Sequence, residues 1–249
     1  MKELVRKTFG SLVFIMALCL TFSVFGNVNA YALDTLRKGN SGDQVLYLQH
    51  TLAKCNVGFT EAEIDGSFGG KTEVALKRFQ MGCKLPPSGV VDSDTWTQLS
   101  GKTDVKAYSL ARDGNTRVSA NFKVGEFACS DGSDFILISN NLLGVLENIR
   151  SRFSRPVKIN SGYRTTAHNA RLGAVPNSQH RYGTAADIVV DGVSGKDLYE
   201  YADKNIPEIV RGGLGAYYQP GHKDDPNFRS NMIHVDVRST RARWTDGIR

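Results

Sequence analysis

The chain has 249 residues, of which 41% are hydrophobic and 22% are charged, and its formal net charge is +6. This positive balance is modest and scattered, so it suits an anionic partner but does not favour nucleic acid. Beyond one N-terminal stretch, no apolar run is long enough to span a membrane, so the rest of the chain is expected to be soluble.

The N-terminus has the three parts of a secretory signal peptide. It begins with a basic head, made of Lys2, Arg6 and Lys7. An uncharged apolar run at 12–25 follows, and then small residues at 30–32, as a signal peptidase requires. The run has 14 residues, fewer than the roughly 20 that cross a bilayer, and an uncleaved anchor is the alternative. We predict that residues 1–32 are removed, which lowers the net charge from +6 to +4 because three bases and one acid leave.

Three cysteines remain after the predicted cleavage, namely Cys55, Cys83 and Cys129. Export permits disulfides, and Cys55 and Cys83 lie in the same N-terminal segment, which makes them the natural pair. Such a bond would close a loop of about 28 residues and contribute roughly 3–4 kcal/mol. Two buried thiols are the alternative. Cys129 is expected to be a buried thiol and not a metal ligand.

Residues 33–101 predict a compact unit of three short helices. Ser41 and Thr72 stand where they can cap two of the helices, each before an apolar stripe. The glycine-rich stretch at 64–69 predicts a turn in which its aspartate bonds the backbone ahead of it. A third helix is expected to begin at 95 and to end near 99.

Several motifs of this unit match one known domain: Leu36-Arg37-Lys38-Gly39, Val45…Leu48-Gln49, Ile64-Asp65-Gly66-Ser67-Phe68-Gly69, Thr72, Ala75, Phe79-Gln80 and Gly89-Val90-Val91…Thr95-Trp96…Leu99. The unit resembles the peptidoglycan-binding domain found beside many wall hydrolases. It departs from that family at Pro86-Pro87-Ser88, where an Asp more often precedes Gly-Val. The resemblance implies binding to wall glycan or stem peptide. A docking or spacer role is the alternative.

Residues 102–110 have no strong periodicity and are predicted to be a linker, so that 111–249 form a second domain. There we expect a short extended piece at 121–127, helices over 142–153 and 194–202, and strands over 157–160, 186–190 and 233–238. Because helices and strands are interspersed without a βαβ repeat, we predict an α+β fold with a small antiparallel sheet.

Two histidines and a carboxylate of this second domain could share a metal. His180 and Asp187 are seven residues apart, and Gly183 between them lets the chain turn so that both reach one point. His234 lies on an alternating strand and projects to the same side as Asp236. Zinc takes imidazole and carboxylate ligands, usually three in a catalytic site. Spacing alone nevertheless favours structural histidines with hydrogen-bonded partners.

Three motifs in order reverse that interpretation. Residues 178–187 fit Ser-x-His-x-x-Gly-x-Ala-x-Asp, Ser161-Gly162-Tyr163-Arg164-Thr165 precedes them, and His234-Val235-Asp236 follows. Together they resemble the zinc D-alanyl-D-alanine carboxypeptidases and related wall endopeptidases, over residues 115–245. The resemblance implies that zinc is bound by His180, Asp187 and His234.

The same resemblance implies further roles. Arg164 matches the residue that pairs with a substrate carboxylate, for which a guanidinium fork is suited; a structural salt bridge is the alternative. Ser178 either holds the substrate backbone or caps the turn. Several relatives have Glu or Asp three residues before the last ligand, where this chain has Asn231. We therefore predict that Asp236 is the general base, and the alternative is that it orients a ligand. Glu126 is a more distant candidate for the base.

We predict zinc-dependent hydrolysis of peptide bonds in bacterial peptidoglycan stem peptides, and favour a D-Ala-D-Ala carboxypeptidase over an endopeptidase. The protein is expected to be secreted and associated with the cell wall, where its first domain raises the local substrate concentration. The alternative, which Asn231 keeps open, is a non-catalytic wall-binding protein with a zinc-bearing C-terminal module. A glycan-cleaving hydrolase is disfavoured because no pair of carboxylates stands out.

Overall fold

The computed structural model describes residues 33–217 and 231–245. The predicted signal peptide, residues 1–32, lies outside the described residues. No helix in the described ranges combines the length and the apolar character needed to cross a membrane.

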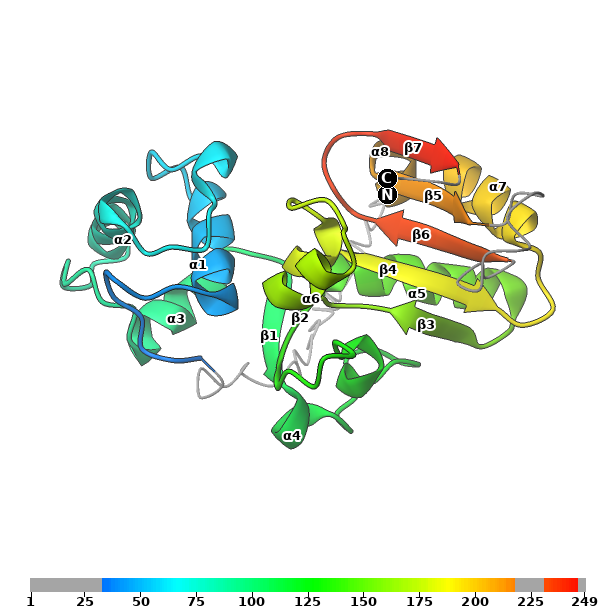
Figure 1. The fold of residues 1–249 in the computed structure, drawn as a ribbon, viewed down its shortest axis with the longest axis horizontal. Coiled ribbons are helices and arrows are strands. Elements are labelled where there is room, and N and C mark those ends of the chain that lie inside the picture. The colour runs from blue at the N-terminus through cyan, green and yellow to red at the C-terminus, as the bar shows by residue number, and fades with distance from the viewer. Residues whose placement is uncertain (1–32, 218–230, 246–249) are drawn as a thin grey trace, which may run out of the picture.

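Three helices form the N-terminal module, which Figure 1 draws on the left. They are α1 (Asp43–Ala53), α2 (Gly70–Gly82) and α3 (Ser93–Ser100), with the 3-10 turn η2 (Glu61–Glu63) between the first two. Leucines at positions 48, 52 and 76 and the indole of Trp96 are buried between them. The expected turn also forms, because the carboxylate of Asp65 accepts from the backbone N–H of Ser67 at 2.8 Å.

Both predicted helix caps are wrong. The residue before α1 is Gly42 and the residue before α2 is Gly69, and neither helix has a side-chain cap. Ser41 instead forms an isolated bridge with Ser67. Thr72 is buried inside α2, where its hydroxyl accepts from the Gln49 amide at 3.1 Å. The third helix begins two residues earlier than predicted, after Asp92, whose side chain does cap it.

Two sheets form the C-terminal part of the molecule. The first pairs β1 (Val105–Ser109) with β2 (Phe135–Ser139). The second has five strands in the order β3 (Val157–Ser161), β4 (Ala185–Val190), β6 (Met232–Asp236), β5 (Gly213–Tyr217) and β7 (Ala242–Thr245). Its neighbours are antiparallel except β5 and β7, which are parallel. The expected small antiparallel sheet is therefore a mixed one.

Helices and turns surround these strands: α4 (Leu110–Asp113), η3 (Val124–Phe127), α5 (Asn140–Phe153), α6 (Thr166–Arg171), η4 (Gln179–Tyr182), α7 (Gly195–Asn205) and α8 (Pro207–Arg211). The apolar stripe of α5 is buried, and α5 contacts β3 while α7 contacts β5 and β6. Figure 1 shows both long helices behind the five-stranded sheet, with α6 at the end of the sheet that faces the N-terminal module.

Two sequence expectations change in this part of the chain, and among the cysteines of both modules the alternative of free thiols holds. The segment predicted as a linker contains β1, whose Val105 is fully buried, because its apolar residues alternate against β2. The piece expected to be extended at 121–127 ends in the 3-10 turn η3. The thiols of Cys55 and Cys83 are free and half-buried, and that of Cys129 is free and buried.

Candidate active site

Two neighbouring strands and one turn bring the predicted ligands together. In the register of β4 and β6, Asp187 lies directly opposite His234. His180 comes from η4, which runs into β4 through Gly183 at φ 67°. A side chain at Gly183 would collide with the backbone of Leu137, so the turn that returns His180 to the strand pair requires glycine.

One ligand atom from each residue points at a common centre. Nδ1 of His234 lies 2.9 Å from Oδ1 of Asp187 and 3.2 Å from Nε2 of His180, and those last two atoms are 3.4 Å apart. All three side chains are buried. Tetrahedral zinc with ligands at ~2.0–2.1 Å has ligand-to-ligand edges of about 3.3 Å. The triangle therefore has the size of a zinc site.

Each ligand is held from behind by a second group. Nδ1 of His180 lies 2.7 Å from the carbonyl oxygen of Gly162, and Nε2 of His234 lies 3.0 Å from Oδ2 of Asp236. The other carboxylate oxygen of Asp187 accepts from Nη2 of Arg164 at 2.5 Å. This network assigns each imidazole proton to the nitrogen that faces away from the centre.

With those tautomers, three acceptors face one another and no proton lies between them. Such an arrangement is repulsive in a buried site unless a cation occupies the centre. Two imidazole nitrogens and one carboxylate oxygen are a donor set that zinc prefers. The residues present therefore fit the metal.

The electrostatics of the cluster agree with that donor set at His180 and Asp187. At His234, burial opposes the charged ring, but the carboxylates of Asp187 and Asp236 raise its pKa in the metal-free site. Burial lowers the pKa of His180, which favours its neutral form. Burial opposes ionisation of Asp187, but attraction to the neighbouring imidazoles, where these carry a proton in the metal-free site, holds the pKa of this carboxyl well below its usual range. A neutral imidazole and an ionised carboxylate are the forms that bind a metal.

Asp236 lies behind His234 and not beside the cavity. It is fully buried, and its oxygens accept from Nε and Nη2 of Arg238 at 2.7 and 2.6 Å and from the N–H of Gly213 at 3.2 Å. A base must reach the proton that it removes. The geometry therefore favours the orienting role of Asp236 over the predicted role as general base, because its bond to His234 is on the side away from the ligand atom.

Arg164 and Ser178 both line the cavity in front of the ligands. Besides its ion pair with Asp187, Arg164 donates from Nε to the Ser161 hydroxyl at 2.8 Å, and its side chain is 14% exposed. The salt bridge given above as an alternative is thus present. Ser178 precedes η4 but makes no capping bond with its side chain, so the capping alternative for this residue is wrong.

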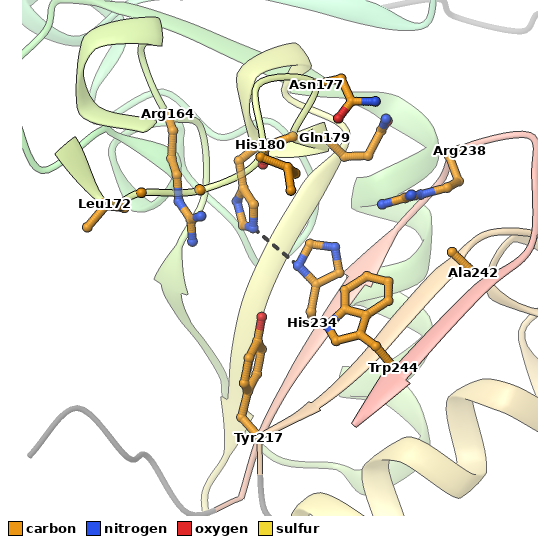
Figure 2. A pocket seen from close by; sticks show the side chains of 14 residues that line it. Arg164, Leu172, Asn177, Gln179, His180, Tyr217, His234, Arg238, Ala242 and Trp244 are labelled. Carbon is orange, nitrogen blue, oxygen red and sulfur yellow. Dashed lines mark hydrogen bonds between the residues drawn. The ribbon is translucent and has the colours of Figure 1, made fainter. Parts of the chain in front are cut away.

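The cavity has a volume of about 410 Å³ and two unlike walls. One wall is the loop after α6, made of Leu172, Gly173, Ala174 and Val175. Figure 2 shows the other, where Tyr217, Ala242 and Trp244 lie beside His234, with Arg238 above them. Asn177, Ser178 and Gln179 also line the cavity and supply polar groups. Of the described residues that line this cavity, none is an aspartate or glutamate.

Sequence reasoning gave no role to Trp244 or Arg238. The Trp244 ring lies 4.9 Å from that of His234, and the Arg238 guanidinium lies 5.7 Å from the indole centroid. Two signals could have indicated them. Arg238 continues the alternation of 234 and 236. Gly215, on the strand beside the ligand strand, marks a close approach, since a side chain there would collide with the indole.

Comparison with known families agrees with both halves of the chain. Residues 118–222 match the Peptidase M15 family, and residues 41–99 match the putative peptidoglycan binding domain. The chain carries a Peptidase M15 domain behind a peptidoglycan-binding domain. It is a zinc metallopeptidase, and the M15 match includes His180 and Asp187 and ends before His234.

Individual relatives cover different shares of this peptidase. It is similar to the zinc D-Ala-D-Ala carboxypeptidase of Streptomyces albus G, with 29% identity over 202 residues, which are 76% of this chain and 73% of the relative. A spore cortex-lytic enzyme of Bacillus cereus is 36% identical over 95 residues, 38% of this chain and 36% of that enzyme. The structure of VanYB in complex with D-alanine-D-alanine covers 53% of this chain and 84% of its own at 18% identity, with a TM-score of 0.28, too low to establish a shared fold.

Proposed function

We propose that this peptidase removes the terminal D-Ala from peptidoglycan stem peptides with zinc held by His180, Asp187 and His234. The observation that carries the proposal is the convergence of three buried acceptors, each held from behind, at the base of a cavity. The substrate class follows from the Streptomyces albus G relative, a zinc D-Ala-D-Ala carboxypeptidase that aligns with 76% of this chain.

The cavity walls suit that substrate. When bound, zinc supplies a Lewis acid and an activated water for hydrolysis. Arg164 keeps guanidinium N–H groups beyond those bonded to Asp187 and Ser161, and they suit a terminal carboxylate. The apolar loop at 172–175 and the opposite aromatic wall leave room for small apolar side chains. Ser178, which lines the same cavity, would bond the peptide backbone.

The N-terminal module is expected to hold the enzyme at the cell wall. A peptidoglycan-binding domain keeps the catalytic cavity near wall peptides and so raises their effective concentration. We therefore place the protein outside the cytoplasmic membrane, associated with the wall, after export by the predicted signal peptide. Peptidoglycan is then both the substrate and the anchoring partner.

Two soluble stem peptides test the activity, one ending in D-Ala-D-Ala with a free carboxylate and one with the same end amidated. We expect free D-Ala, identified by mass, from the acid only, with loss of release after chelation and recovery with zinc. His180→Ala should abolish release, whereas His168→Ala, at a half-buried histidine that does not line the cavity, should not.

Other products would overturn the proposal in distinct ways. Internal cleavage of both peptides would identify an endopeptidase. In that case Arg164 does not bind a terminal carboxylate of the substrate. Binding to purified walls without any product, in zinc-loaded protein, would support the non-catalytic alternative.

A further inference from the structure

Helix α1 of the N-terminal module has two different faces. Its apolar face, with Val45, Leu48 and Leu52, is buried in the module's own core. Its second face carries side chains spaced three or four residues apart, which therefore align along the helix: Asp43, Tyr47, His50 and Lys54. In Figure 1, α1 is the helix of the module that lies nearest to the sheets.

Asp43 and Tyr47 bond to the catalytic part of the molecule. Oδ1 of Asp43 accepts from the backbone N–H of Thr166 at 3.0 Å and from its hydroxyl at 2.5 Å. The Tyr47 hydroxyl donates to the carbonyl oxygen of Val105, in β1, at 3.0 Å. This second bond is buried, and a buried hydroxyl without a partner would be costly.

His50 and the residue after the helix continue the contact. The His50 ring stacks on that of Tyr182 with centroids 4.7 Å apart and an interplanar angle of 11°. Burial lowers the pKa of His50 to about 4, so the ring is neutral in this contact. Lys54 forms an ion pair with Asp104 at 3.9 Å.

Two of these partners stand next to the catalytic groups. Thr166 begins α6 two residues after Arg164, and Tyr182 ends η4 two residues after His180. The two loops are also tied to each other, since the N–H of Arg164 donates to the carbonyl oxygen of His180 at 3.1 Å. A displacement of either contact with α1 would therefore shift Arg164 or His180.

We infer that the face of α1 formed by Asp43, Tyr47, His50 and Lys54 positions Arg164 and His180, so that the peptidoglycan-binding module is part of the catalytic scaffold as well as an anchor. Asp43 and His50 are seven residues apart, about 10 Å along a helix. The helix thus sets the spacing between α6 and η4. The buried apolar cluster supports this, because it runs without interruption from α1 to the five-stranded sheet.

This inference rests on the proposed roles of Arg164 and His180, and pairs of variants test it in the full chain. His50→Ala removes the stack, whereas His50→Phe retains it. Asp43→Ala removes both acceptor contacts, whereas Asp43→Asn keeps an amide oxygen at the same place. Lys71→Ala is the matched control, because this lysine of α2 is 80% exposed and pairs only within its own module, with Glu63.

The measurements are zinc affinity, by competition with a chelating dye, and kcat and KM on the soluble D-Ala-D-Ala peptide, which needs no wall binding. We expect His50→Ala to weaken zinc binding roughly tenfold, the lower end of the loss when an orienting contact behind a ligand is removed. Asp43→Ala should raise KM about tenfold, since Arg164 moves relative to the substrate. The Phe and Asn variants and the control should stay near the wild type.

Thr166→Val removes only the hydroxyl bond to Asp43 and leaves the backbone N–H in place, so it should raise KM less than Asp43→Ala does and should not add to it in the double variant. This second route keeps the test valid if one variant folds poorly. If all folded variants keep zinc affinity and KM within about twofold of wild type, the inference is overturned and the module is only an anchor. A wild-type protein that releases no D-Ala would instead refute the proposed function, while the zinc measurements would still decide the inference.

Discussion

Each of the proposed ligands depends on a residue that does not touch the centre itself. Gly162, Asp236 and Arg164 bond the far side of His180, His234 and Asp187, and so aim one lone pair from each at the centre. Such partners fix the tautomer and raise the basicity of the ligand. Asn231, which stands where several relatives have an acid, does not line the cavity, and its amide oxygen accepts from the N–H of Gly195 at 3.1 Å.

Asp236→Asn separates the two roles considered for this carboxylate. The amide leaves His234 without its charged partner and the Arg238 guanidinium without its counterion. We expect zinc affinity to fall about 10–100-fold, with turnover largely recovered at saturating zinc. A base would behave in the opposite way, with unchanged zinc affinity and lost turnover. Dye competition and kcat distinguish the two, and Asp94→Asn, at an exposed acid of α3, is the control.

At the scale of elements, the pairing of strands builds one wall of the cavity. β5 lies between the ligand strand β6 and the last strand β7, in parallel register with β7. This register places Gly215 opposite both His234 and Trp244. The indole can lie over the sheet beside the metal centre only because β5 has no side chain there.

Gly215→Ala should therefore destabilise the protein, because the methyl group would overlap the Trp244 ring. We expect a loss of roughly 1–3 kcal/mol, as for overpacking elsewhere, measured by urea unfolding with tryptophan fluorescence. Gly144→Ala provides the contrast: it lies within α5 with open space around it and should stabilise by about 1 kcal/mol. Equal stabilities of the two variants would contradict this account.

For the whole molecule, the contact between the two modules should respond to pH through His50. Its pKa is about 4 in the folded protein against 6.5 ordinarily, because burial and Lys54 disfavour the charged ring while Asp104 partly opposes them. The unfolded chain therefore takes up the proton first as pH falls. This contribution to stability is complete above pH 6.5 and is lost between pH 6.5 and 4.

His50→Phe removes this titration and keeps the stack on Tyr182. Urea unfolding at several pH values should show that the wild type loses more stability than this variant as the pH falls through that window. Parallel curves for the two proteins would show that the interface histidine does not titrate in it.

Much of the fold followed from local pattern. Apolar spacing predicted α1, α2 and α5, and strict alternation predicted the strand that carries His234. The caps of α1 and α2 could not be predicted, because Ser41 and Thr72 have the right chemistry at the wrong place relative to the first helical turn. β1 was missed because its burial depends on a distant partner strand.

The sequence by itself determined which residues are the candidate metal ligands, since the order of the three motifs singles out His180, Asp187 and His234 as a set. The tertiary structure alone decided which atoms face inward. Alternation places Asp236 and His234 on the same face of one strand. It does not predict which of the two side chains lies nearer to the cavity. The packing of β5 and Arg238 against that face holds Asp236 on the far side of His234, which favours an orienting role for this carboxylate. The docking of α1 brings the N-terminal module against the turn that carries His180.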